Sequence, residues 1–237
     1  MTIPQANVDA NEIERRGLRE QVYDSVLRRL LDGRIASGER LSIEDVARTL
    51  NVSPTPVREA FVMLERTGLV SRIAQRGYRV APPLDSAQLA ELFEARLLLE
   101  VHAAHLAHAR RDELLPELRR ITSQHDEHAE RIIEYGEQTS VPIEATQAYF
   151  TSDAAFHNAI FDNAGNRYLI DMYGSLGALT HRMRQIAVRG PGDVREATLE
   201  HHAIVEAFAS GDSDAAAAAM RQHIENVRTR SLERPAD

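Results

Sequence analysis

Residues 51–70 of the chain read NVSPTPVREAFVMLERTGLV, and this stretch decides the fold of the first third of the protein. Ser53 can cap a helix by accepting a hydrogen bond from a backbone N–H, and Pro54 suits the first helical position, where no amide hydrogen is needed. Apolar residues then recur at helical spacing, at Val57, Ala60, Phe61 and Leu64. The pattern predicts a helix over residues 54–66 with one apolar face.

The segments around this helix follow the order of a winged helix-turn-helix domain. Apolar residues at helical spacing predict a helix over 18–32, and a capping-box-like start predicts a short helix over 42–50. Residues 69–80 are typical of two short strands joined by a tight hairpin. Three helices followed by a hairpin therefore predict a winged helix-turn-helix domain at residues 13–81, preceded by a disordered tail at 1–12.

This arrangement predicts which side chains face DNA. In a helix-turn-helix, a short bracing helix supports a second helix whose first residues enter the major groove. Thr55 and Arg58 lie on the polar face of that second helix, and Arg48 near the end of the bracing helix can hold a phosphate. The hairpin tip at Arg76-Gly77 can reach the minor groove or the backbone. The alternative is that these arginines form only a solvated surface.

The charge of the chain is divided unevenly between its two parts. The chain has 237 residues and a net charge of −8, but residues 1–82 hold 13 arginines against 11 acidic residues. Residues 83–237 hold 15 arginines against 25 acidic residues. An acidic second domain does not prevent a locally basic face from binding phosphates, because the field falls off within about 8 Å at physiological salt.

Two features that the sequence lacks exclude several classes of protein. The chain has no cysteine, which excludes disulfides, thiolate zinc sites and cysteine nucleophiles. The first residues lack the apolar run of a signal peptide, and no segment approaches the roughly 18 apolar residues of a membrane span. These features predict a cytoplasmic protein that does not contact a membrane.

Residues beyond 81 favour an all-helical domain. Prolines at 82 and 83 mark a linker over 82–85, and the rest of the chain to residue 232 has helical periodicity. The predicted helices cover about 86–110, 112–136, 145–163, 166–189, 194–210 and 212–231, with a break at Gly190-Pro191-Gly192. The fold class is thus mainly α, with an N-terminal winged helix-turn-helix and a C-terminal all-α helical bundle over 86–232.

Histidines in this second domain suggest a metal site. Asp153 and His157 are four residues apart and so share one helix face. His201 (or His202) and His223 lie on the last two predicted helices. A carboxylate and three imidazoles that converge from separate helices can hold a divalent metal ion. The alternative is that these are hydrogen-bonded core histidines.

The other histidines of the chain are interpreted as partly exposed residues without a role, although one of them, His181, can line a pocket. They are His102, His105, His108, His125, His128 and His181. Arg96 lies in an otherwise apolar helical run, and a buried guanidinium needs an anionic partner. That partner is either Glu100, in a structural pair, or the carboxylate of a bound effector.

The first domain resembles the GntR superfamily of transcriptional regulators. The resemblance covers about 65 residues and rests on residues 38–41, on the motif 51–60, on 64–70 and on 76–80. In that family the Thr and Arg of the motif contact operator DNA, which implies that Thr55 and Arg58 do so here. Many members have Arg after the Ser of the motif, where this chain has Pro54. The complete predicted DNA-binding set is Arg48, Ser53, Thr55, Pro56, Arg58, Arg76 and Gly77.

The second domain resembles the FCD type of effector domain, in the FadR-like branch of the same superfamily. The resemblance rests on residues 93–100, 153–157, 165–166, 200–204 and 211–223. It implies a bundle of six or seven helices with a zinc, nickel or similar ion. The metal ligands that it implies are Asp153, His157, His201 and His223. His201 is preferred to His202 because it directly follows Glu200 at the family's spacing.

The resemblance implies a homodimer that reads a palindromic operator in double-stranded DNA and senses a small carboxylate at the metal, with Arg96 in the effector site. Repression released by the ligand is the commoner behaviour in the family. One alternative is a regulator whose second domain only dimerises. A metalloenzyme is disfavoured, because a di-iron bundle needs Glu-x-x-His pairs and no histidine here has Glu three residues earlier.

Overall fold

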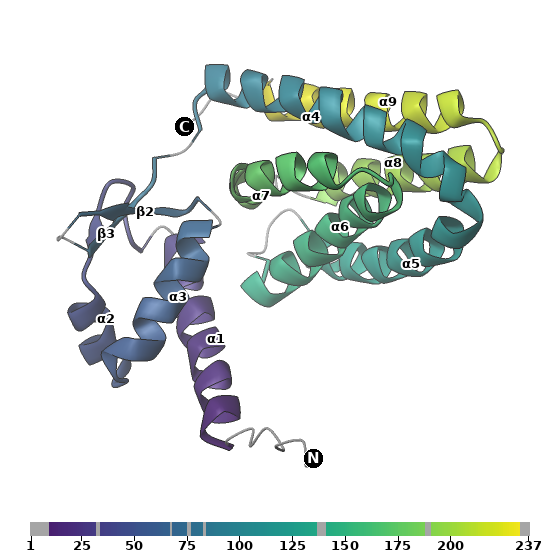
Figure 1. Ribbon diagram of the computed structural model, residues 1–237. Coiled ribbons are helices and arrows are strands. Elements are labelled where there is room, and N and C mark those ends of the chain that lie inside the picture. The colour runs from purple at the N-terminus through teal and green to yellow at the C-terminus, as the bar shows by residue number, and fades with distance from the viewer. Residues whose placement is uncertain are drawn as a thin grey trace, which may run out of the picture. The chain divides into compact units, whose positions relative to one another are not determined.

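A computed structural model of the chain describes residues 10–31, 34–66, 68–74, 77–82, 84–136, 141–187 and 191–232. The chain divides into two compact units, Met1–Pro83 and Leu84–Asp237. Both units are largely helical, and the first also contains a small sheet (Figure 1). The fold class predicted from the sequence is thus confirmed.

The first unit is a winged helix-turn-helix. Its elements are α1 (Ala10–Leu31), β1 (Arg40–Leu41), α2 (Ile43–Leu50), α3 (Pro54–Arg66), β2 (Val70–Ile73) and β3 (Gly77–Val80). The three strands form an antiparallel sheet in the order β1-β3-β2, in which Leu41 pairs with Tyr78 and Val70 pairs with Val80. Strands β2 and β3 are the predicted hairpin, while β1 lies between the first two predicted helices, where no strand was predicted.

The core of the first unit forms where α3 packs against α1 and the sheet. Val57, Ala60, Phe61 and Leu64 are all buried, as the spacing of apolar residues in α3 requires. The Phe61 ring stacks on the Tyr78 ring of β3, with 4.8 Å between centroids. The sheet therefore holds α3 by its apolar face and leaves its polar face outward.

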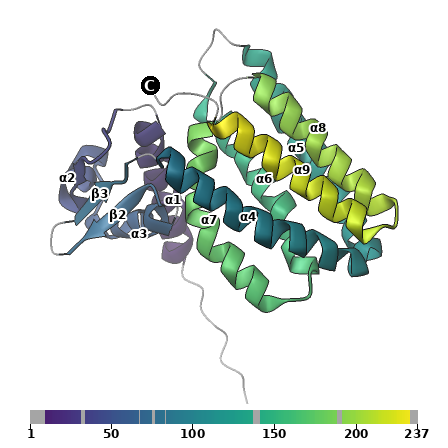
Figure 2. The ribbon, with the colours of Figure 1, turned by 90° about the horizontal axis from the view of Figure 1, so that it is seen from above.

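The second unit is an all-helical bundle. Its elements are α4 (Ser86–Ala107), the 3-10 turn η1 (His108–Arg110), α5 (Arg111–Tyr135), α6 (Ile143–Asn163), α7 (Arg167–Ala187), α8 (Pro191–Ala209) and α9 (Ser213–Leu232). Helices α4 and α9 lie side by side, and α5 packs against both α6 and α8 (Figure 2). Within the described part of the chain, no helix is both long enough and apolar enough to cross a membrane.

Some element boundaries differ from those predicted. Helix α1 begins at Ala10, inside the segment predicted as a tail, while residues 1–9 lie outside the described residues. Helix α8 begins at Pro191, which had been interpreted as part of a break. Proline lacks an amide hydrogen, and the first helical position does not need one, so Pro191 starts the helix that follows.

Gly77 is required where β3 begins. Its φ of +86° is left-handed, and a Cβ atom added there would lie 2.7 Å from the carbonyl oxygen of Leu41. That oxygen belongs to β1, the strand paired with β3. A side chain at this position would therefore force the two strands apart.

We expect Gly77→Ala to destabilise the sheet more than Gly38→Ala does. Gly38 has a similar φ of +79° but no atom within 4 Å of the added Cβ, so its substitution carries only the conformational cost of about 1–2 kcal/mol. Amide hydrogen exchange at Val80, whose N–H bonds to Glu39, measures the free energy of opening. Equal losses in the two variants would contradict the steric role of Gly77.

Candidate functional site

The first part of the candidate site is the N-terminal turn of α3. Ser42 caps α2 by accepting a hydrogen bond from the N–H of Asp45, and Asn51 turns the chain with a left-handed φ of 53°. This tight turn leads directly into α3. Ser53, Thr55 and Arg58 are exposed at its beginning, where a recognition helix contacts base edges.

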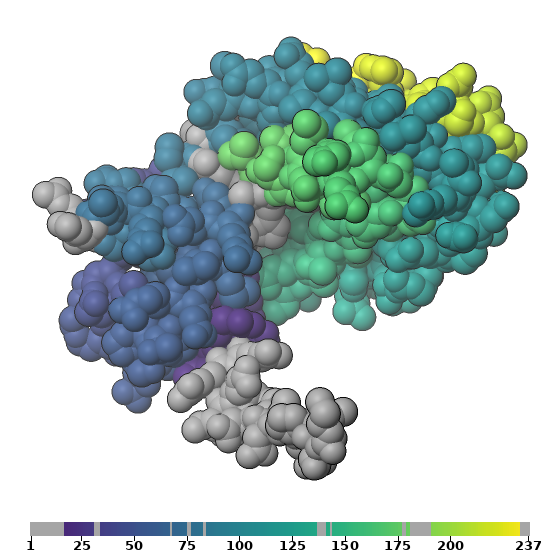
Figure 3. Space-filling model, viewed as in Figure 1, coloured from purple at the N-terminus to yellow at the C-terminus, as the bar shows by residue number. Residues whose placement is uncertain are grey.

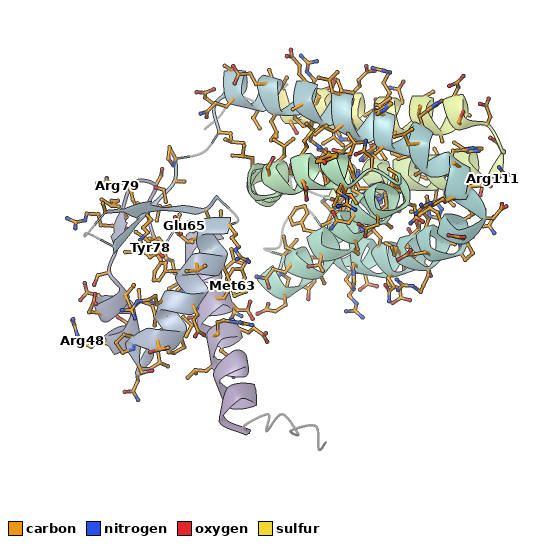
Figure 4. All side chains as sticks on the ribbon, viewed as in Figure 1. Arg48, Met63, Glu65, Tyr78, Arg79 and Arg111 are labelled. Carbon is orange, nitrogen blue, oxygen red and sulfur yellow. The ribbon has the colours of Figure 1, made fainter. Side chains whose placement is uncertain are left out.

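Other residues predicted to contact DNA have different surroundings. Pro56 is buried against the unit's core, so its ring supports the start of α3 rather than lining its exposed face. Arg48 is 76% exposed and pairs with Asp45 at 2.6 Å, and its side chain projects outward from α2 (Figure 4). Gly77 has the steric role described above, and Arg76 lies outside the described residues.

The second part is a cluster of buried side chains inside the helical bundle. Asp153 and His157 come from α6, His201 from α8 and His223 from α9, and all four are buried. One potential ligand atom from each of His157, His201 and His223 lies within 4.8 Å of the others. The structure also brings the Asp153 carboxylate to 3.5 Å from Nε2 of His201 and 3.8 Å from Nε2 of His157.

Two glutamates orient the histidines of this cluster. Nδ1 of His157 lies 2.6 Å from Oε2 of Glu100, and Nδ1 of His223 lies 2.8 Å from Oε2 of Glu200. An ionised carboxylate can only accept, so both imidazoles carry their proton on Nδ1. Their Nε2 atoms are left as bare lone pairs, which is the form of histidine that binds a metal.

Arginines keep the two glutamates ionised. Nε of Arg96 bonds Oε1 of Glu100 at 2.6 Å, and Nη1 of Arg230 bonds Oε1 of Glu200 at 2.7 Å. Burial alone would raise the pKa of Glu100, but Arg96 and His157 together hold it well below its ordinary value. Burial acts in the same direction on Glu200, where bonds from His223 and Arg230 lower the pKa to about 2.

Two histidines of the cluster, His201 and His223, are held in the neutral form. Burial lowers the pKa of His201 well below its usual range, and the neighbouring His223 adds to this. Burial also lowers the pKa of His223, against the opposing effect of Glu200. Neutral imidazole is the form that coordinates metals, so the cluster is prepared for an ion at neutral pH.

The donor set fits a divalent metal ion. Three imidazoles and a carboxylate contributed by three helices are typical ligands for zinc, nickel or similar ions. Both ring nitrogens of His201 and of His157 lack a partner with hydrogen-bond geometry among the described residues, although Nδ1 of His157 lies 2.6 Å from Glu100. Buried polar atoms without partners are costly, and an ion bound among them would remove that cost.

Two histidines were wrongly interpreted as partly exposed. His125 of α5 is completely buried and forms a second group with Asp153 and His201, in which the potential ligand atoms lie within 4.8 Å of one another. His108 is also buried, and its ring stacks on Phe208. The signal for His125 was present in the sequence, since it follows Leu118 and Ile121 on the apolar face of α5.

The remaining predicted residues can now be placed. His202 is exposed and bonds Asp126, so it points away from the cluster that contains His201. Arg96 is buried and forms the predicted structural pair with Glu100, whose contact with His157 the sequence did not reveal. Of the lesser candidates, His102 and His105 are exposed and His128 is half-buried, and the side chain of His181 lies outside the described residues.

Comparison with known families identifies both units. Residues 18–80 match the bacterial regulatory proteins of the gntR family, and residues 91–226 match the FCD domain. The chain belongs to the GntR family of transcriptional regulators, in the FadR-like branch that carries an FCD C-terminal domain. It is a DNA-binding regulator and not an enzyme.

Individual relatives agree with this assignment. The chain is 26% identical to the HTH-type transcriptional regulator YdhC of Bacillus subtilis, over 86% of this chain and 84% of the relative. It is also 26% identical to the HTH-type transcriptional repressor RspR of Escherichia coli, over 89% and 87% of the two chains. The solved structure of E. coli McbR/YncC has the same fold, with a TM-score of 0.64 at 21% identity over 88% of this chain and 94% of that one.

We expect the metal-free protein to lose stability as the pH falls from about 6.5 toward 4. The folded pKa values of His125, His201 and His223 lie below that of an exposed histidine, so the unfolded chain takes up protons first. Each unit by which a histidine pKa is lower in the folded than in the unfolded chain corresponds to about 1.4 kcal/mol of stability. Glu100 and Glu200 affect stability in a different pH range. Their stabilising contribution is fully present above pH 4.5 and is lost only as the pH falls toward 2.

Urea unfolding of the chelated protein at pH 7.5 and pH 5 measures this dependence. The midpoint should be lower at pH 5. His202→Gln is the matched control, because His202 is exposed and lies outside the buried cluster. A midpoint that is equal at the two pH values would show that the buried histidines are not held neutral.

Proposed function

We propose that this chain is a ligand-responsive repressor that binds a palindromic operator as a homodimer and senses a small organic acid at a metal-containing pocket. The observation that carries the proposal is the buried cluster of three histidines and a carboxylate in a protein whose other unit reads DNA. Burying such a cluster costs free energy that a unit serving only to dimerise would not need to spend. A bound ion would offset that cost.

In this proposal Ser53, Thr55 and Arg58 read the major groove, and Arg48 holds a phosphate. Ser53 is exposed directly before α3, and Thr55 and Arg58 are exposed within its first five residues. Arg48 is already exposed, and its partner Asp45 can release it because an exposed ion pair contributes little, about 0–1 kcal/mol. Arg76 would contact DNA from the hairpin, in line with the family resemblance.

We expect Arg58→Ala to weaken binding to the operator about 10–100-fold, because a good base contact contributes about 1–3 kcal/mol. The operator can be obtained by selecting duplexes from a random pool with the wild-type protein, and affinity can be measured by fluorescence anisotropy. Arg66→Ala is the matched control, since Arg66 is also exposed on α3 but lies in its last turn. Normal binding by Arg58→Ala would overturn the assignment of the recognition helix.

Asp153, His157, His201 and His223 would hold a divalent ion, with zinc or nickel best suited to this donor set. Such an ion supplies open coordination positions for an oxygen of an organic acid. The chain's own contribution is to fix the orientation of the histidines through Glu100 and Glu200. Arg96 is near enough to this network to bind an effector carboxylate in competition with Glu100.

Homodimerisation and repression are the remaining parts of the proposal. Helix α7 exposes large apolar side chains, including Tyr168 at 71% and Met172 at 54%, and α7 lies open on the visible face of the second unit (Figure 3). Exposed apolar surface of this kind favours a second protein surface as its partner. RspR of E. coli, a relative of similar length, is a transcriptional repressor. An acid that prefers one arrangement of the dimer would shift the population toward it.

The test of this proposal is thermal unfolding of the purified protein with a panel of small organic acids, before and after chelation. A ligand at about a hundred times its dissociation constant adds roughly 2.7 kcal/mol, which raises the midpoint by several degrees at about 2–4 °C per kcal/mol. We expect one class of acid to stabilise only the metal-loaded protein. If chelation changes nothing and no acid shifts the midpoint, the second unit is a dimerisation domain with structural histidines.

A further inference from the structure

His125 is the buried histidine that neither the sequence pattern nor the family resemblance assigns to a function. It lies on α5, in the middle of the helix, with none of its surface exposed. Its ring is 4.9 Å from the ring of His201, centroid to centroid. One of its nitrogens lies within 4.8 Å of potential ligand atoms of both Asp153 and His201. His125 therefore borders the same cluster as the four proposed ligands.

The hydrogen bond on the other side of the ring determines which nitrogen carries the proton. Nδ1 of His125 lies 2.9 Å from Oγ of Ser152. The Ser152 hydroxyl has one proton, and it also lies 2.8 Å from the backbone carbonyl of Tyr149 and 3.2 Å from that of Ala148. Carbonyl oxygens can only accept, so the hydroxyl proton points toward them, and Ser152 accepts from Nδ1 of His125.

The inner nitrogen of His125 is consequently a bare lone pair. Nε2 is buried and has no hydrogen-bond partner among the described residues. His125 thus has the same arrangement as His157 and His223, whose outer nitrogens are held by Glu100 and Glu200 and whose inner nitrogens face the cluster. An outer acceptor that fixes the tautomer is the usual companion of a metal-ligating histidine.

A purely structural role explains the position of the His125 ring and the bond at Nδ1, but it does not explain Nε2. The bond to Ser152 and the stacking of the ring on Tyr149, at 4.4 Å between centroids, account for its position. They leave the Nε2 lone pair unsatisfied, which costs about 1–3 kcal/mol in a buried site. An apolar residue would fill the same space without that cost.

We propose that His125 is a fifth protein ligand of the metal ion, beside Asp153, His157, His201 and His223. This inference rests on the proposed metal site. An octahedral ion with four protein ligands has two open positions, and with five it has one. An effector that coordinates through two oxygens would then have to displace one of the five protein ligands, whereas one that uses a single oxygen would not.

The test uses the full-length protein loaded with cobalt(II) alone. In the proton NMR spectrum, each ligating histidine with a ring N–H gives one exchangeable signal that the cobalt ion shifts strongly. The number of these signals is therefore the number of ligating imidazoles. We expect four such signals in the wild-type protein and three in His125→Leu. We also expect the affinity for cobalt, measured by competition with a chelator, to fall about 10–100-fold.

His128→Leu is the matched control for this substitution. His128 lies one turn further along α5 and also bonds Oγ of Ser152, at 3.1 Å, but it belongs to neither group of potential ligands among the described residues. It should keep all four signals and the wild-type affinity. If His125→Leu matches His128→Leu in both measurements, His125 is not a ligand.

Two further variants make the outcomes separable. If wild-type protein binds no cobalt, the proposed metal site itself is wrong, whereas loss of cobalt in His157→Leu with no change in His125→Leu overturns only the inference about His125. Ser152→Ala tests the same point without altering the ring, should His125→Leu fail to fold. It should move or abolish the His125 N–H signal alone, and an unchanged spectrum would overturn the inference.

Discussion

Each imidazole buried in the helical bundle has two nitrogens, and both need a partner because water cannot reach them. Glu200 and Ser152 bond the outer nitrogens of His223 and His125, and Glu100 lies 2.6 Å from the outer nitrogen of His157. The inner nitrogens are thereby forced into the unprotonated form and face one another across the centre of the bundle. Much of the second unit can be understood as a frame for this arrangement, since the residues involved come from all of its helices except α7.

Burying the two glutamates requires positive charge nearby. Arg96 and Arg230 supply this charge. The cluster is therefore flanked by two networks of side chains, each made of an arginine, a glutamate and a histidine. A buried pair of this kind contributes little net stability, but the loss of one partner is expensive. The network of Arg96 joins α4 to α6, and the network of Arg230 joins α9 to α8. A ligand that takes Arg96 away from Glu100 would therefore also disturb the orientation of His157, which links an effector carboxylate to the metal position.

Local signals in the sequence were sufficient for the first unit. The cap at Ser42, the proline at the start of α3 and the apolar positions 57, 60, 61 and 64 act within a few residues of one another, and the winged helix-turn-helix followed from them. The strand β1 was missed, because two residues carry no periodicity and pair only through β3, some forty positions later. In the second unit the helices were predicted, but the burial of His108 and His125 was not. The apolar face of α5 includes His125, yet the sequence alone did not identify what that face packs against.

The sequence by itself determined the class of protein, the order of its helices and of the β2–β3 hairpin, and the residue types capable of reading DNA and binding a metal. These depend on short-range spacing and on a motif whose residues are contiguous. Only the tertiary structure decided which histidines have a buried lone pair, that Glu100 joins Arg96 to His157, and that His202 points outward while His201 points in. Those properties arise when helices far apart in the chain pack together. Burial and hydrogen-bond partners depend on every packed neighbour, whereas spacing along one helix reports only on that helix.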